Sequence, residues 1–244
     1  MTKTELHRTP GGSFSRLYAN MSEQTHLLIA GRTGSGKSVA VNGILHSLLC
    51  RKTCNETQLI LIDPKRVELS PWKHSPHCIA YAADDLTERV QTLSYAIRII
   101  EKRFAYMEGK QLRKYDGGDV YVIIDELADI MTTQKAQVFP LLQRIGQIGR
   151  AARVHLIACT QCPLVQIIPT PLKCNFDAIL GLKTRSAQDS RNIIGSPGCE
   201  SLPQYGQGYY ITPQQEKIVD LPLIPETEIN RITAYWSDRK NYVV

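Results

Sequence analysis

The chain has 244 residues, enough for one large domain with small appendages, and 43% of them are hydrophobic while 21% are charged. This composition is typical of a soluble globular protein with a full core. No apolar run reaches the roughly 18 residues of a membrane-spanning helix, and residues 1–12 lack the apolar stretch of a secretory signal.

Charge and cysteine usage indicate where the chain works. The net charge of +6 is mildly basic, which is compatible with a nucleic-acid partner but does not require one. Seven cysteines, several of them in apolar segments (Cys50, Cys78 and Cys159), predict reduced, buried thiols. Cys159 and Cys162 have the spacing of a zinc or redox pair, but no second pair follows, so we interpret them as a strand end. We therefore expect a cytoplasmic protein that meets a membrane only through a partner.

The first quarter of the chain contains two predicted strands and one predicted helix. Residues 1–25 are expected to form an N-terminal extension with a loop at 9–13. The apolar run 26–30 then predicts a buried parallel strand. Residues 39–49 have apolar side chains at helical spacing and no proline, which predicts a helix, and 58–62 predicts a second buried strand.

Two long helices and a third strand follow. Apolar side chains step by three and four across 84–107, which predicts a helix that Asp84 or Asp85 caps. A polar, basic linker leads to the third strand at 120–124, and residues 134–148 predict a further helix.

The last part of the chain completes the sheet. Strands are predicted at 154–159 and 178–182, and the segments 208–211 and 217–219 predict a terminal hairpin. Strands that alternate with helices imply β-α-β units. The predicted fold class is therefore α/β, with a mainly parallel sheet, helices on both of its faces and a C-terminal β-hairpin.

A glycine-rich loop lies between the first predicted strand and the first predicted helix. Its sequence, GRTGSGKS at 31–38, matches the phosphate-binding pattern GxxxxGKS in full. The glycines let successive backbone N–H groups face one anion, Lys37 is expected to reach the β- and γ-phosphates, and the Ser38 hydroxyl is expected to bind Mg²⁺. The alternative is a glycine-rich turn with an incidental lysine, but the flanking strand and helix favour a site for ATP and Mg²⁺. The expected nucleotide contacts are Gly31, Arg32, Thr33, Gly34, Ser35, Gly36, Lys37, Ser38 and Val39.

Two acids end the third predicted strand. Asp125 and Glu126 follow directly after 120–124, and neighbouring parallel strands deliver such residues into one crevice. Asp125 is expected to hold Mg²⁺ together with Ser38, and Glu126 to polarise the attacking water, which hydrolysis requires and simple binding does not. The alternative is a strand followed by a solvated acidic helix start, which suits the helix dipole. The phosphate loop favours the catalytic interpretation.

Polar groups around the fourth predicted strand have more than one interpretation. Gln161 follows that strand and is either a turn residue or a reader of the γ-phosphate. Arginines 144, 150 and 153 lie just before the strand. Such arginines can act on the nucleotide of a neighbouring subunit, bind a DNA backbone or stay solvated, and spacing alone does not choose between these functions.

Several separated stretches resemble the motor domain of the FtsK/SpoIIIE family of DNA-pumping ATPases, within the wider FtsK–HerA group. Together they span most of the region 26–211. The stretches are 26–42, 62–70 (IDPKRVELS), 123–131, 149–152 (GRAA), 155–158, 160–161, 189–191 and 200–202. The DPK and GRAA pieces are specific to this family, whereas the phosphate loop is shared by many families.

The resemblance implies a RecA-like P-loop core and a homo-oligomeric ring, usually a hexamer, around double-stranded DNA, with translocation driven by ATP hydrolysis. By position it assigns phosphate contact to Lys37, metal binding to Asp125 and water activation to Glu126. It assigns γ-phosphate sensing to Gln161 and action in trans to Arg150, with Arg153 and Arg191 as further candidates in trans. It also divides the chain into an N-terminal extension, an ATPase domain and a tail with a short helix, at 1–25, 26–220 and 221–244.

The chain departs from the family pattern in places. Cys162 stands where the family usually has an arginine, and Arg153 replaces a usual glycine. We expect the chain to lack the family's membrane-spanning part and its winged-helix module. We expect a minimal motor for conjugative transfer or partitioning of mobile-element DNA, with a membrane or relaxase partner protein and no membrane insertion of its own. The alternatives are a viral-type genome-packaging ATPase and an ATP-dependent substrate recruiter of a secretion channel.

Overall fold

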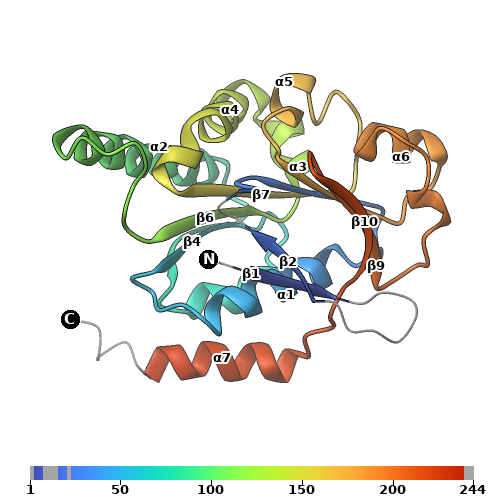
Figure 1. Cartoon of the computed structure of the whole chain (residues 1–244), viewed down its shortest axis with the longest axis horizontal. Coiled ribbons are helices and arrows are strands. Elements are labelled where there is room, and N and C mark those ends of the chain that lie inside the picture. Colours follow the sequence, from blue (N-terminus) through green and yellow to red (C-terminus); the bar gives the residue numbers. More distant parts are fainter. Residues whose placement is uncertain (1–2, 8–15, 21–22, 239–244) are drawn as a thin grey trace.

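The computed structural model describes residues 3–7, 16–20 and 23–238, with side chains described from residue 23 onward, and the loop predicted at 9–13 lies outside these residues. Figure 1 shows a central sheet with helices on both sides. The strands are β1 Lys3–His7, β2 Arg16–Asn20, β3 Leu27–Ala30, β4 Thr57–Ile62, β5 Cys78–Ala82, β6 Asp119–Ile124, β7 Val154–Thr160, β8 Ala178–Leu182, β9 Gln207–Thr212 and β10 Gln215–Asp220. The helices are α1 Lys37–Leu49, η1 Ser70–His74, α2 Leu86–Gly109, α3 Leu127–Thr133, α4 Lys135–Ala152, α5 Thr170–Lys173, α6 Ala187–Ile194, η2 Cys199–Ser201 and α7 Glu226–Asp238.

An eight-stranded sheet runs in the order β10-β9-β8-β3-β7-β6-β4-β5. The strands from β8 to β5 are parallel, and the β9–β10 hairpin adds to β8 in antiparallel sense. Every residue of β6 and β7 is buried, because both faces of the sheet are covered, and apolar runs of this kind are what such strands require. The predicted fold class is confirmed, with its parallel sheet and terminal hairpin.

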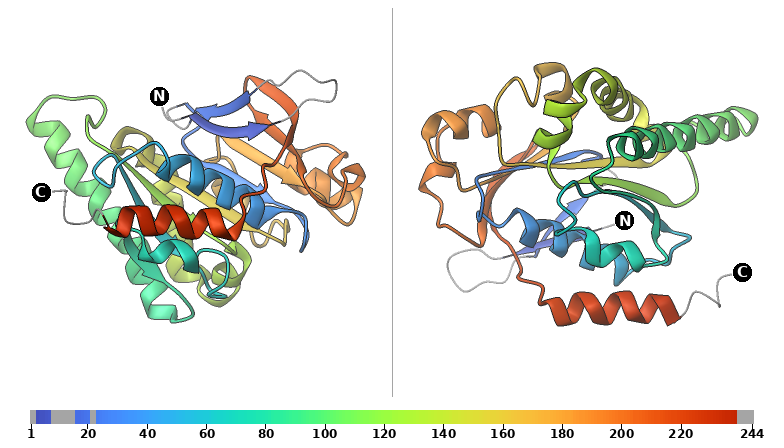
Figure 2. Two further views of the ribbon diagram at one scale, coloured as in Figure 1. Left: turned by 90° about the horizontal axis from the view of Figure 1, so that it is seen from below. Right: turned by 180° about the vertical axis from the view of Figure 1, so that it is seen from behind.

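Helices cover the two faces of the sheet unequally. One face packs against α1, η1 and α7, with Leu45 and Trp72 fully buried in its core. The other face packs against α2, α3, α4 and α6, with Ile100 and Leu142 fully buried there. Figure 2 shows α7 on the side of α1, opposite the long helices α2 and α4. The antiparallel pair β1–β2 lies outside the main sheet, beside α1.

Local chemistry sets the ends of the long helices. The side chain of Asp85 accepts a hydrogen bond from the backbone N–H of Glu88 at 2.8 Å and so caps α2. Asp84, the other predicted cap, instead pairs with Arg66. Helix α4 ends at Arg153, which has a left-handed conformation with φ of 54°. That turn lets the chain enter β7 directly.

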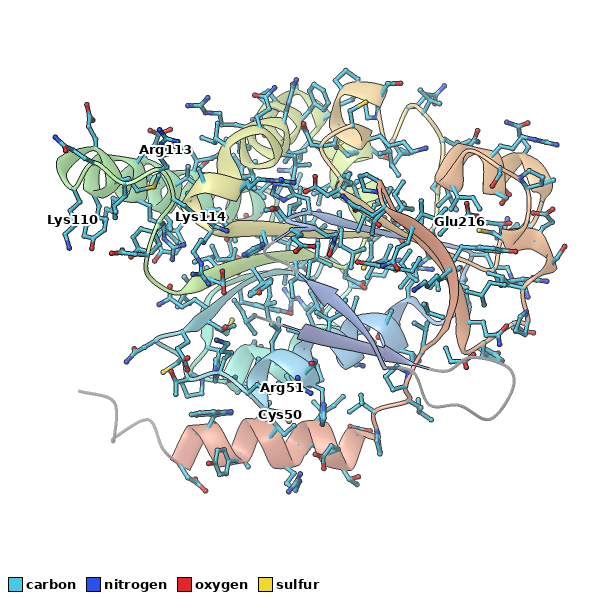
Figure 3. All side chains as sticks on the ribbon, in the orientation of Figure 1. Cys50, Arg51, Lys110, Arg113, Lys114 and Glu216 are labelled. Carbon is cyan, nitrogen blue, oxygen red and sulfur yellow. The ribbon has the colours of Figure 1, made fainter. Side chains whose placement is uncertain are left out.

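The cysteine prediction is only partly correct. Cys159 is fully buried in β7, but Cys78 is half-buried on the edge strand β5, and Cys50 is exposed. Cys50 reaches solvent because it is the residue at which α1 ends, facing α7 (Figure 3). All the described cysteines are free thiols, and the described residues hold no group of three or more His, Cys, Asp or Glu side chains arranged for a metal. Across the described ranges, no helix has both the length and the apolar character that crossing a bilayer demands.

Candidate nucleotide site

Four loops meet at the carboxyl edge of the parallel strands. The strand registers align Ala30 with Thr160 and Ile124 with both Ala158 and Ile62. The residues that come next are therefore brought side by side along one edge of the sheet. In spatial order they are Gly31, Gln161, Asp125 and Asp63. The structure thus gathers the predicted phosphate loop, the predicted sensor and the predicted acids at one place.

The phosphate loop requires its glycines. Gly34 and Gly36 have φ of 70° and 100°, a backbone conformation that other residues adopt only with strain. At Gly31 an added Cβ would lie 2.7 Å from both the Cβ of Leu182 and the Oγ of Ser35. The loop therefore passes so close to β8 that only a glycine fits there.

Helix α1 presents free backbone donors to this loop. It begins at Lys37, and its first backbone hydrogen bond in the usual pattern runs from the N–H of Ala40 to the carbonyl oxygen of Gly36 at 2.9 Å. The N–H groups of Lys37, Ser38 and Val39 precede that bond, so they have no partner within the helix. These N–H groups and the positive end of the helix dipole form a favourable binding place for an anion.

Backbone carbonyl groups of the phosphate loop hold the side chain of Lys37 inside the loop. Its Nζ donates to the carbonyl oxygens of Gly31 and Arg32, each at 2.8 Å, and the residue is only 8% exposed. Burial lowers the pKa of Lys37, while Cys159, Glu126 and Asp125 oppose that shift. The ammonium is therefore preorganised next to the space that the loop encloses.

The carboxyl group of Asp125 lies in a crowded acidic environment. Burial raises its pKa to about 7, and repulsion from Asp63, Glu68 and Glu126 adds to that effect. Within the described part of the chain, Oδ1 of Asp63 and Oγ of Ser35 are buried without a hydrogen-bond partner. Uncompensated acids and unused oxygens are what a hard divalent cation binds, so these residues fit Mg²⁺.

Glu126 is almost fully enclosed, with 3% of its surface exposed. Its Oε1 accepts hydrogen bonds from the backbone N–H groups of Ala128 at 3.3 Å and Gln161 at 3.1 Å. The same residue caps α3, because its backbone is extended where that helix begins. Its Oε2 lies 3.7 Å from the Nζ of Lys65, which belongs to the loop after β4. Glu126 therefore connects the ends of β4, β6 and β7.

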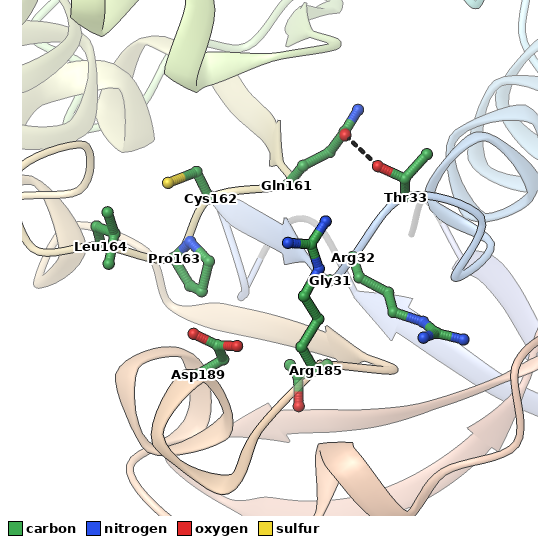
Figure 4. A pocket seen from close by; sticks show the side chains of 10 residues that line it. Gly31, Arg32, Thr33, Gln161, Cys162, Pro163, Leu164, Arg185 and Asp189 are labelled. Carbon is green, nitrogen blue, oxygen red and sulfur yellow. Dashed lines mark hydrogen bonds between the residues drawn. The ribbon is translucent and has the colours of Figure 1, made fainter.

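Gln161 joins this acid to the phosphate loop. Its Oε1 accepts a hydrogen bond from the hydroxyl of Thr33 at 2.6 Å (Figure 4), while its backbone N–H donates to Glu126. A pocket of about 310 Å³ opens beside this contact and is also lined by Arg185 and Asp189, from the loop and helix after β8. Gln161 is thus placed where it contacts both the loop and the acid.

The three candidate arginines occupy different environments. Arg150 donates to Asp177 at 2.6 Å and to the carbonyl oxygen of Glu23 at 3.2 Å, at the amino ends of the strands, and 56% of its side chain is exposed. Arg153 is bound by both oxygens of Asp119 at 2.8 Å. Arg191 is exposed on α6. Arg150 and Arg153 therefore lie at the opposite edge of the sheet from the phosphate loop.

Sequence reasoning missed two cations of this site. Lys65 contacts Glu126, and Arg185 lines the pocket beside the loop. Lys65 belongs to the DPK stretch on which the family resemblance rested, so that stretch was a usable signal. Arg185 follows β8 without any motif, and only the pairing of β8 with β3 brings it to the loop.

Comparison with known proteins decides the family. The sequence profile of the FtsK/SpoIIIE family matches residues 3–121 and 118–165, well over half of the chain. The chain belongs to the FtsK/SpoIIIE family. DNA translocase FtsK 1 of Neisseria meningitidis serogroup A is 30% identical over 260 residues, which cover 92% of this chain and 32% of that protein. The chain thus spans about a third of the length of the curated relatives it matches.

Solved structures share the fold of this FtsK/SpoIIIE chain. The conjugation coupling protein TcpA of pCW3, solved with ATPγS, has a TM-score of 0.82 at 18% identity and covers 96% of this chain and 70% of that one. ATPases 2 and 3 of EssC from Geobacillus thermodenitrificans have a TM-score of 0.86 at 16% identity, covering 99% of this chain and 49% of that one. At these identities the likeness shows a shared fold.

Proposed function

We propose that the chain is an ATP-hydrolysing ring motor that binds and translocates double-stranded DNA, in conjugative transfer or partitioning of mobile-element DNA. The observation that carries the proposal is the placement of Glu126 beside the phosphate loop, joined to it through Gln161. A protein that only binds nucleotide needs the loop but not a buried carboxylate and a polar amide next to it. The identity to proteins named DNA translocase supports DNA as the substrate.

ATP would bind with its phosphates against the first turn of α1. Lys37 exchanges the carbonyl oxygens of Gly31 and Arg32 for the β- and γ-phosphate oxygens, which are better partners because they carry charge. Ser38 and Asp125 would hold Mg²⁺, which when bound neutralises charge on the phosphates. The acidic pair Asp125 and Asp63 then no longer faces uncompensated repulsion.

Hydrolysis would proceed through Glu126. The carboxylate orients a water molecule and accepts its proton as the water oxygen bonds to the γ-phosphorus. The bond from that phosphorus to the bridging oxygen breaks, and ADP and phosphate leave. The side chain of Gln161 contacts Thr33 in the loop, and its backbone N–H contacts Glu126. Loss of the γ-phosphate would therefore alter the contacts of Thr33 and of Glu126 together.

A neighbouring subunit would complete the site. Arg150 lies at the opposite edge of the sheet from its own phosphate loop, so it can act on a nucleotide only from the next subunit of a ring. Arg113, Lys114 and Gln147 line a hollow together with Arg150. Figure 3 shows Arg113 and Lys114 near the far end of α2, together with Lys110. This basic surface suits a phosphate group that a second copy of the chain presents.

The test is an ATPase assay with increasing duplex DNA. The expected result is saturable stimulation of the wild-type protein by DNA. Lys37→Ala should lose nucleotide binding, whereas Glu126→Gln should bind ATP and lose turnover by about 100-fold or more. Turnover retained in Glu126→Gln would remove the catalytic assignment of that residue.

The alternative to a DNA motor is a protein-handling recruiter of a secretion channel. It is considered because the cytoplasmic domain of the Type VII secretion ATPase EccC from Thermomonospora curvata shares the fold, with a TM-score of 0.79. Such a protein should hydrolyse ATP at a rate that duplex DNA leaves unchanged. Absence of stimulation at DNA concentrations that saturate binding would therefore contradict the motor. A packaging ATPase would respond to DNA as a conjugative motor does. The identity of the neighbouring genes would distinguish these two pathways.

A further inference from the structure

The loop at 63–69 joins β4 to η1 and has a defined structure. Asp63 is fully buried at its start, and its Oδ2 accepts hydrogen bonds from the backbone N–H groups of Leu69 at 3.0 Å and Ser70 at 3.1 Å. Both ends of the loop are thereby tied to one carboxylate. Residues 65–67 between these ends are exposed, and we call this segment the arch.

The arch has an exposed tip. Val67 is 63% exposed, although it is a large apolar residue, and Arg66 adopts a left-handed conformation with φ of 57°. Arg66 also pairs with Asp84, and both of these side chains are largely exposed. A non-glycine residue with positive φ is strained, and such strain persists where the surrounding structure demands it.

Lys65 connects this arch to Glu126, the residue proposed to accept the proton of the attacking water. Its Nζ lies 3.7 Å from Oε2 of Glu126, while 44% of its own side chain is exposed against 3% for that of Glu126. The other oxygen of Glu126 is occupied by two backbone N–H groups, from Ala128 and Gln161. Of these three partners of Glu126, only Lys65 contributes a side chain, and it is the most exposed of the three residues.

We call this geometry the resting arrangement of Glu126, the proposed catalytic base, because its Oε2 is paired with Lys65. A water molecule that is to lose a proton to Glu126 must approach an oxygen of its carboxylate. Within the described ranges, Oε2 is the oxygen to which no backbone N–H donates. The ammonium of Lys65 competes with that water for Oε2. An ion pair with one exposed partner is weak and screened, so another anion can displace it.

We propose that Lys65 is a positioning residue that holds Glu126 in this resting arrangement until the phosphate backbone of duplex DNA draws the lysine away. Lys65 and Arg66 are neighbouring cations on the exposed arch, and cations on an exposed loop are the usual partners of nucleic-acid phosphates. The inference rests on the proposed catalytic role of Glu126.

The experiment compares Lys65→Met, Lys65→Arg and the matched control Arg66→Met, in ATPase assays without and with saturating duplex DNA. Lys65→Met should raise the DNA-free kcat by about fivefold, because loss of a weak ion pair changes an equilibrium by about that factor. The KM for ATP should stay unchanged. The DNA-saturated rate should stay at the wild-type value, so the stimulation factor falls. Lys65→Arg keeps the positive charge and should keep the low DNA-free rate of the wild type. The control Arg66→Met should also have the DNA-free rate of the wild type.

The outcomes separate this inference from the proposed function. A DNA-free kcat that is unchanged or lowered in Lys65→Met would overturn the resting arrangement, even if DNA stimulates the wild type. The double variant Lys65→Met with Glu126→Gln should be inactive, because the added turnover must pass through Glu126. If instead Glu126→Gln alone hydrolyses ATP, the catalytic assignment is wrong and that error is visible without any change at Lys65.

Discussion

Asp125 shows how burial controls the chemistry of a single residue in this site. Its carboxyl is enclosed near Asp63, Glu68 and Glu126, and its pKa is raised to about 7 from the ordinary value near 4. The free chain therefore binds a proton at Asp125 more tightly when folded than when unfolded. The stability of the folded state falls as the pH rises from about 4 through 7, because the site then accumulates an uncompensated charge.

Asp125→Asn should stabilise the nucleotide-free protein at pH 8 and leave its stability nearly unchanged at pH 4. A shift of about three pKa units corresponds to an effect on the order of 4 kcal/mol at most. Urea unfolding in EDTA at both pH values measures this difference. Equal stability of variant and wild type at pH 8 would show that Asp125 is not strained in the free chain. Adding Mg²⁺ with an ATP analogue should reverse the order, because only the aspartate binds the cation.

At the scale of elements, the site depends on the close pairing of β3 with β8. Gly31 follows β3 at the point where the chain crosses the end of β8, and the N–H of Arg32 donates to the carbonyl oxygen of Lys183 at 2.9 Å. The phosphate loop is therefore built on the sheet rather than suspended from it. Its shape follows from the strand that lies next to it as much as from its own sequence.

Gly31→Ala should destabilise the protein by about 2 kcal/mol and weaken ATP binding, because the added methyl group meets Leu182 and Ser35 at 2.7 Å. Denaturant unfolding and titration with a fluorescent ATP analogue measure the two effects. The control is Gly109→Ala at the end of α2, where an added Cβ meets no atom within 4 Å and φ is not positive. Similar losses in both variants would contradict a specific effect at the loop.

At the scale of the whole molecule, the candidate residues lie at the two opposite ends of the parallel strands. Nucleotide groups gather at the carboxyl ends of the strands, whereas Arg150, with its partner Asp177, lies at their amino ends. The two edges of one chain cannot cooperate on one nucleotide. In a closed ring each carboxyl edge can face the amino edge of the next copy, and a site made from two chains then couples neighbouring subunits.

Arg150→Ala should keep ATP binding and lose turnover by about 1,000-fold, the size of effect that an arginine acting in trans has on phosphoryl transfer. Mixing it with inactive Glu126→Gln should restore part of the activity, because a mixed ring contains interfaces with one intact half from each. Arg144→Ala on the same helix, whose contact with Glu101 is exposed at 3.5 Å, is the control and should behave as wild type. Full turnover in isolated Arg150→Ala monomers would exclude action in trans.

Much of the fold follows from local sequence. The buried strands could be predicted because apolar runs of their length leave no other favourable state, and the phosphate loop because few residue combinations can cradle an anion. Strand β5 was not predicted, since it is a half-buried edge strand whose apolar pattern is weak. Helices α5 and α6 are too short for a periodic signal.

The sequence by itself determined the family, the sheet-and-helix alternation and the identities of the loop, Asp125 and Glu126. Only the tertiary structure decided how these groups meet. It set the strand order, which places Gln161 between the loop and the acid, the burial that raises the pKa of Asp125, and the approach of Lys65 to Glu126. The physical reason is that residue type is local information, whereas burial and contact across strands arise from segments far apart in the chain, such as Thr33 and Gln161, which are separated by 128 positions.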